Sequence, residues 1–148
     1  MSDREFTLAE ARETLDLIRE QVDQLQQTQG QLRAVKAELS ALNRRHLNNG
    51  RIGDAELRKV QHRQRQLGEA ASQLVRSIHA TGAVIKGVDE GLIDFPATID
   101  GTQGYWCWKA GEDDIDWWHR RSSGFADRRP IAGLPPDQSD AQPGKSEP

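Results

Sequence analysis

The first part of the chain repeats apolar residues at alternating intervals of three and four, the spacing of an amphipathic helix with one apolar stripe. Before the stripe, Thr7 and Glu10 have the separation of a capping box, which predicts a helix start. The stripe is interrupted at Gln29 and Gly30, where glycine predicts a bend or weak point. The apolar positions are Leu8, Ala11, Leu15, Ile18, Val22, Leu25, Leu32, Val35, Leu39 and Leu42. Together these features predict a long helix over about residues 7–47.

A second stripe with heptad spacing follows a polar stretch at residues 46–53, whose asparagines and glycines predict a stop and a turn. We expect Asp54 to cap this second helix, which covers about residues 54–80. The stripe consists of Leu57, Val60, Gln64, Leu67, Ala71, Leu74 and Ile78. Two such stripes joined by a short turn predict an antiparallel, coiled-coil-like helical hairpin over residues 5–81.

After Gly82 the pattern changes to short β-branched and aromatic segments separated by turn residues. Asp100-Gly101 is a two-residue hairpin signal, and Pro96 predicts an edge or a bulge because it has no N–H for a sheet ladder. We expect a module over residues 82–131, with three or four antiparallel strands in a meander packed on the start of helix 1. The predicted fold class is therefore α+β. Residues 132–148, rich in proline and poor in apolar residues, are predicted to be a disordered tail.

The composition of the chain indicates where in the cell the protein is found and how charge is distributed along the sequence. The chain has 148 residues, 35% hydrophobic and 29% charged, with one cysteine and a net charge of −3. Without an apolar run of membrane length or a signal-peptide pattern, and without a possible internal disulfide, we expect a cytoplasmic protein that does not bind membranes. Residues 44–65 carry seven basic and two acidic residues, whereas residues 82–119 carry two and eight. The hairpin tip is therefore basic and the β module acidic.

Several short motifs occur together in this order along the chain. They are Phe6-Thr7-Leu8-Ala9-Glu10-Ala11, Gly91-Leu92-Ile93-Asp94-Phe95-Pro96-Ala97, Cys107-Trp108, Gly111-Glu112, Trp118-His119 and Gly124-Phe125. On these residues the chain, over about residues 5–131, resembles an uncharacterised prokaryotic family, domain of unknown function 2203. The resemblance implies a small bacterial protein with a helical hairpin and a β module, and it implies no activity.

A mixed set of metal-ligand types lies within the β module. Asp94, Cys107, Glu112 and His119 offer oxygen, sulfur and nitrogen ligands within 26 residues, a combination that suits zinc or another transition metal. The spacing matches no standard metal motif, and strand register decides whether the four converge. The alternative is a buried cysteine that packs as a small hydrophobe, beside a histidine hydrogen-bonded to a carboxylate. Asp94, between Ile93 and Phe95, needs a partner in either case.

The same residues could support catalysis. Cys107 could act as a nucleophile activated by His119, but the flanking tryptophans and the acidic surroundings disfavour a thiolate. Asp94 and Glu112 could form a carboxylate pair for acid–base chemistry. The four tryptophans, Trp106, Trp108, Trp117 and Trp118, alternate between the two faces of their strands. We expect one face in the core, and the other either exposed or covered by residues 122–125.

The basic hairpin tip is a candidate for binding anions or nucleic acid, because clustered arginines suit phosphate groups. The residues concerned are Arg44, Arg45, Arg51, Arg58 and Arg63. No aromatic residue lies among them, so a solvated tip is the simpler interpretation.

From the sequence we expect a non-enzymatic interaction or adaptor protein that self-associates or binds a protein partner through the hairpin and the aromatic β module. The first alternative is a metal-binding or catalytic module centred on Asp94, Cys107, Glu112 and His119. The second is nucleic-acid binding by the tip.

Overall fold

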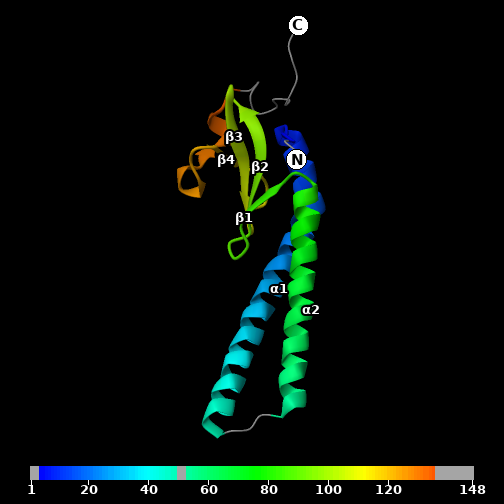
Figure 1. Ribbon diagram of the computed structural model, residues 1–148. Helices are drawn as coiled ribbons and strands as arrows, with labels where there is room; N and C mark the ends of the chain where they lie inside the picture. Colours follow the sequence, from blue (N-terminus) through cyan, green and yellow to red (C-terminus); the bar gives the residue numbers. More distant parts are fainter. Residues whose placement is uncertain (1–3, 50–52, 136–148) are drawn as a thin grey trace.

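The computed structural model, which describes residues 4–49 and 53–135, is a helical hairpin joined to a small antiparallel sheet (Figure 1). The sheet is a simple meander in the order β1-β2-β3-β4-β5, so the predicted α+β class is confirmed, with five strands instead of three or four. The elements are α1 (Leu8–Asn49), α2 (Asp54–Ala80), β1 (Val84–Gly87), β2 (Leu92–Ile99), β3 (Thr102–Lys109), β4 (Trp117–Arg120), η1 (Phe125–Asp127), β5 (Arg129–Pro130) and η2 (Ile131–Gly133).

The two helices follow the predicted pattern closely but differ at their ends. The capping box forms, with the Glu10 amide donating to Thr7 Oγ1 and the Thr7 amide donating to Glu10 Oε1, both at 2.9 Å. At α2, Gly53 rather than Asp54 occupies the N-cap, and it makes no side-chain capping bond. The prediction that Asp54 caps the helix was therefore wrong, because Asp54 is already its first helical residue.

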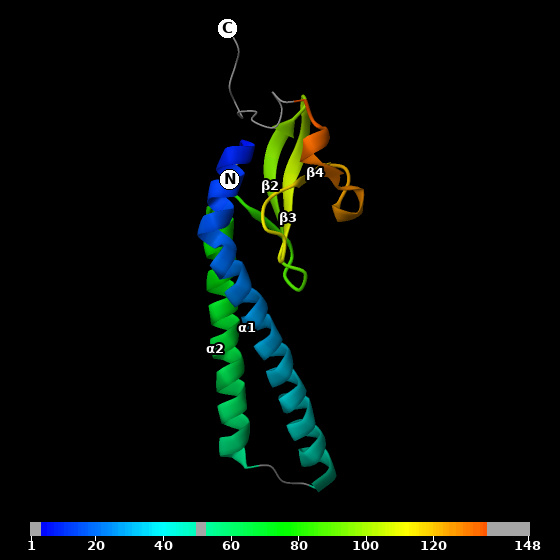
Figure 2. The same ribbon diagram turned by 180° about the vertical axis from the view of Figure 1, so that it is seen from behind.

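Apolar packing divides α1 into two parts, although the helix itself is continuous through Gly30. The large cluster joins the start of α1, the end of α2 and the sheet, whereas a small cluster of Val35, Leu42 and Val60 lies within the hairpin alone. The hairpin extends away from the sheet, as both views show (Figures 1 and 2). The weak point expected at Gln29 and Gly30 thus coincides with the gap between the two clusters.

Alternation in the strands separates aromatic from polar chemistry. Phe95 is opposite Trp106, which is opposite Trp118, and Ile93 is opposite Trp108. Since residues directly opposite share a face, these side chains form one surface, and all of them belong to the large core with α1. Only Trp117 among the tryptophans lies on the other face, which we call the outer face of the sheet. Most of the aromatic residues therefore serve as core.

Residues 4–7 attach the start of α1 to the sheet. β1 pairs with β2 only as far as Asp94, so the edge of β2 is open at Pro96, and the Phe6 amide donates to the Pro96 carbonyl at 2.8 Å. The Phe6 carbonyl in turn accepts the Trp106 indole N–H at 2.9 Å. Pro96 thus lies on a locally open edge, in agreement with the sequence expectation.

The turn between β2 and β3 is the predicted tight hairpin. Asp100 and Gly101 both have positive φ, 54° and 74°, as a type I′ turn requires. At the carboxyl end, η2 is already part of the structure, with Ile131 buried and Leu134 packed against the core. The rest of the predicted tail, from residue 136 on, lies outside the described residues.

The capping box gives a direct test of how α1 is started. We expect Thr7→Ala to lower the free energy of unfolding by about 1 kcal/mol, because the Glu10 amide loses its acceptor. Thr7→Ser keeps the hydroxyl and should retain most of that stability in urea unfolding followed by circular dichroism. An equal loss in both variants would show that the buried methyl group, and not the cap, is responsible.

Candidate metal centre

Three of the four predicted ligands meet on the outer face of the sheet. Asp94 on β2 is opposite Cys107 on β3, and His119 on β4 is opposite Tyr105, two residues from Cys107. Their ligand atoms, a carboxylate oxygen, Sγ and an imidazole nitrogen, all lie within 4.8 Å of one another. All three side chains are buried. We call these three residues the outer-face triad.

The orientation of His119 is fixed by two hydrogen bonds. Nδ1 lies 2.9 Å from the Arg120 carbonyl oxygen, and Nε2 lies 2.9 Å from Asp94 Oδ2. A carbonyl oxygen only accepts, so Nδ1 carries a hydrogen and Nε2 is the atom turned toward the triad. The short contact between Nε2 and Oδ2 then needs one further proton between those two atoms.

The protonation of His119 reflects this environment. Burial lowers its pKa, but the hydrogen bonds to Asp94 and to the Arg120 carbonyl, together with the charge of Asp94, outweigh burial and raise the pKa above the ordinary value. The hydrogen bond to Asp94 therefore favours the protonated imidazole. A metal ion at Nε2 and the carboxylate would take the place of the proton between them.

Asp94 is not fully satisfied by its partners. Its Oδ2 atom also has the Lys86 ammonium at 4.0 Å, and the Cys107 thiol is a further hydrogen-bond partner of the carboxylate, whereas Oδ1 has no partner of regular geometry within the described parts of the chain. An unpaired buried polar atom costs roughly 1–3 kcal/mol, and more when it is charged. The Asp94 carboxylate therefore keeps acceptor capacity beside the thiol and the imidazole.

Cys107 is a protected thiol rather than an activated one. Burial first, and then the negative charge of Asp94 and a hydrogen bond to it, raise the pKa of Cys107 to about 12, although the nearby Arg128 guanidinium opposes the shift. Nη1 of Arg128 lies 3.9 Å from Sγ. At neutral pH the thiol is therefore protonated, which disfavours the nucleophilic role considered from the sequence.

Glu112 lies beside the triad and not within it. Its carboxylate forms a two-armed ion pair with Arg128, at 2.7 and 3.1 Å, and accepts the Lys109 amide at 2.8 Å. Glu112 therefore holds Arg128 against Cys107. Its carboxylate is engaged there and does not form a pair with Asp94 for acid–base chemistry. Glu112 and Arg128 lie 16 residues apart in the chain, so their pairing leaves no local signal in the sequence.

Lys86 reaches the triad from an irregular position. The register of β1 against β2 shifts between Ile85 and Gly87, so Lys86 is the extra residue of a bulge. Bulges re-aim side chains. Here the ammonium lies both near Asp94 and 4.5 Å from the centre of the Tyr105 ring.

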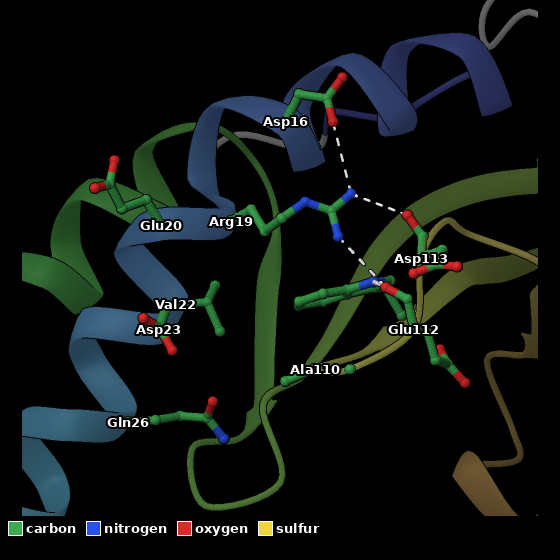
Figure 3. Close-up of a pocket in the computed structure, with 11 residues that line it drawn as sticks. Asp16, Arg19, Glu20, Val22, Asp23, Gln26, Ala110, Glu112 and Asp113 are labelled. Carbon is green, nitrogen blue, oxygen red and sulfur yellow. Dashed lines mark hydrogen bonds and ion pairs between the residues drawn. The ribbon is translucent and has the colours of Figure 1, made fainter.

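A groove of about 560 Å³ separates α1 from the turn that carries Glu112 (Figure 3). Arg19 crosses it, donating to the carbonyls of Glu112 and Asp113 at 3.4 and 3.2 Å and pairing with Asp16. Arg12 binds the same turn through the Ile115 carbonyl at 2.9 Å. The turn, and with it Glu112 and Arg128, is thus positioned by the first turns of α1.

The described end of the hairpin, beyond the small cluster, lies away from the sheet (Figures 1 and 2). Arg44, Arg45 and Arg58 are exposed, and Arg51 lies outside the described residues. Arg45 pairs with Glu56 at 3.6 Å and Arg63 with Glu38 at 3.0 Å. Nucleic-acid binding by the tip stays a prediction.

Burial of Cys107 predicts its reactivity. In the native protein the thiol should resist alkylation by iodoacetamide at pH 8, because it is both inaccessible and protonated, and it should react rapidly in denaturant. Mass spectrometry of the adduct measures this. Fast modification of the folded protein would contradict both the burial and the raised pKa.

Comparison with protein families gives a match over most of the chain. The family described as "Uncharacterized conserved protein (DUF2203)" matches residues 4–131, which include both helices, the sheet and the triad. Neither the search of the curated proteins nor that of the solved structures found a match. Among the described residues, no helix is both long and apolar enough to span a bilayer. The chain belongs to the uncharacterised family DUF2203.

Proposed function

We propose that this protein binds a transition-metal ion, zinc in the first place, through Asp94, Cys107 and His119. The observation that carries the proposal is the approach of three different buried ligand atoms to within 4.8 Å of one another. A sulfur, a nitrogen and an oxygen ligand are typical of zinc. Glu112, the fourth residue predicted from the sequence, is assigned instead to holding Arg128.

The surroundings of the triad fit an outer shell for a metal. A metal-binding histidine generally donates its second ring N–H to a carbonyl or carboxylate, as Nδ1 of His119 does to Arg120. Arg128 lies close enough to Cys107 to stabilise the thiolate that forms when the metal displaces the proton. Lys86 opposes binding by its charge and must turn away from Asp94. Three protein ligands leave one tetrahedral position for water or another molecule.

Metal analysis of the purified protein tests the proposal. We expect about one zinc per chain after incubation with zinc and desalting, and loss of at least about 90% of it in Cys107→Ser and His119→Ala, since each removes one ligand. The Co²⁺ form should show thiolate charge-transfer absorption that disappears in Cys107→Ser. The matched controls are His79→Ala and Asp116→Asn, at exposed positions. Circular dichroism of each variant shows whether it is folded.

Zinc retained at full occupancy in folded Cys107→Ser and His119→Ala would refute the site. So would the absence of zinc and cobalt binding by the folded wild-type protein. Lys86→Met should bind zinc more tightly than wild type, because it removes a competing positive charge next to Asp94. If the wild-type protein binds zinc only weakly, measurable binding by Lys86→Met shows that the site exists, whereas no binding by this variant shows that it does not.

A second function, self-association through the hairpin, is favoured by the small distal cluster. Val35, Leu42 and Val60 are buried there, but Leu39, Leu57 and Leu67 are only partly covered, because two helices alone cannot enclose a heptad stripe. A second copy carries the same stripe, and two hairpins related by a two-fold axis would cover each other as a four-helix bundle. This would make the protein an interaction module, as the sequence suggests.

Sedimentation equilibrium tests the hairpin proposal. We expect a dimer for the wild-type protein and a monomer for Leu57→Gln, whose side chain lies on the half-covered stripe. Leu17→Gln is the matched control, since Leu17 is 74% exposed and belongs to neither cluster. A monomeric wild-type protein, or equal dissociation by both variants, would refute the proposal.

A further inference from the structure

A separate cavity lies where the amino-terminal segment meets β2, β3 and the residue after β4. Its volume is about 480 Å³, and none of the triad residues line it. Its polar and aromatic lining consists of Arg4, Glu5, Gln103, Tyr105 and Arg121. These residues come from both ends of the folded chain, so the cavity exists only in the complete fold.

Arg4 is fixed before any ligand arrives. Its Nη1 atom donates to the Thr81 carbonyl at 2.8 Å, and its guanidinium lies 4.1 Å from the centre of the Phe6 ring. The stem of the side chain runs over Gly82, where an added Cβ atom would come within 3.0 Å of Arg4 Cδ. Gly82, with φ of +100°, is therefore the residue that lets Arg4 lie in this place.

Arg121 is held by contacts with β3. Its guanidinium lies 5.2 Å from the centre of the Tyr105 ring, and its backbone amide donates to the Gln103 carbonyl at 3.1 Å. A cation–π contact of this kind orients the guanidinium but neither neutralises its charge nor occupies its N–H donors. The donors of Arg121 thus stay available at the cavity.

The two guanidinium charges are not neutralised. Of the arginines near the sheet, Arg12, Arg19 and Arg128 have carboxylate partners within 4 Å. Within residues 4–49 and 53–135, no ion pair is formed by Arg4, Arg120, Arg121 or Arg129, and of these four only Arg4 and Arg121 line the cavity. Glu5, the carboxylate in the cavity lining, accepts the Thr98 hydroxyl at 2.9 Å. Two cations facing one acidic group give the cavity an excess positive charge.

We propose that this cavity binds a small phosphorylated molecule, with the phosphate between Arg4 and Arg121. Guanidinium groups present paired donors that match phosphate oxygens, and two of them balance a dianion. A volume of about 480 Å³ lies within the range of small-molecule pockets, roughly 300–1,000 Å³, which favours a compact ligand over a polymer. The Gln103 side chain and the Tyr105 ring then contact the remainder of the ligand. This proposal does not depend on the metal centre.

Calorimetric titration of the full chain at low salt tests the assignment, with inorganic phosphate, adenosine monophosphate, succinate and a single-stranded oligonucleotide as separate probes. We expect the monophosphate to bind more tightly than phosphate, and both more tightly than succinate. Arg4→Gln and Arg121→Gln should each weaken monophosphate binding by at least about tenfold, because each removes a charge-assisted contact. Arg76→Gln, at an exposed position on α2, is the matched control and should bind as wild type does.

Three results would overturn the assignment. The first is the absence of monophosphate binding by the folded protein, and the second is an equal effect of all three arginine variants. The third is tighter binding of succinate than of the monophosphate, which would indicate a carboxylate ligand, or binding of the oligonucleotide alone, which would indicate a nucleic-acid polymer. Because Arg4 and Arg121 do not touch the triad, failure here leaves the zinc measurements unaffected.

Discussion

The backbone of Phe6 is the contact on which the two halves of this protein depend. Its amide satisfies the Pro96 carbonyl on the open edge of β2, and its carbonyl satisfies the buried Trp106 indole. Its ring meets Phe95 edge-on at 5.3 Å. Each of these partners is buried or lies at a point where the ladder lacks a strand, so the sheet would carry unsatisfied polar groups without residues 4–7. The helix start and the sheet are therefore one cooperative structure.

The separation of chemistry between the two sheet faces follows from this attachment. With one face of each strand packed against α1, the opposite positions carry Asp94, Cys107 and His119, with Arg128 and Lys86 around them. Polar groups so close together are tolerated because they neutralise and hydrogen-bond one another in pairs: Asp94 with His119, and Glu112 with Arg128. The Oδ1 atom of Asp94 lacks a partner of regular geometry among the described residues, so this carboxylate keeps capacity for a further contact.

Local sequence signals were sufficient for most of the fold. The Thr7–Glu10 capping box, the heptad stripes and the Asp100-Gly101 turn each involve residues a few positions apart, and all are present in the structure. The pairing of Glu112 with Arg128 could not be predicted, because it depends on how the chain returns across β4. The same holds for the triad. The sequence shows that Asp94, Cys107 and His119 are residue types that bind metals. Whether they lie close together depends on the register of three strands, which the sequence does not show. Arg4 and Arg121 lie 117 positions apart and gave no signal at all.

A single helix of 42 residues, about 63 Å long at ~1.5 Å per residue, passes through both apolar clusters. Its first turns belong to the large core with the sheet, and its last turns to a cluster of three buried side chains. Local unfolding free energies follow the apolar area that each segment buries. Local stability therefore falls along the helix, and opening costs most in the first turns, which pack against the sheet, and least in the last turns. Amide hydrogens along this one continuous element would then exchange more slowly the closer they lie to the sheet.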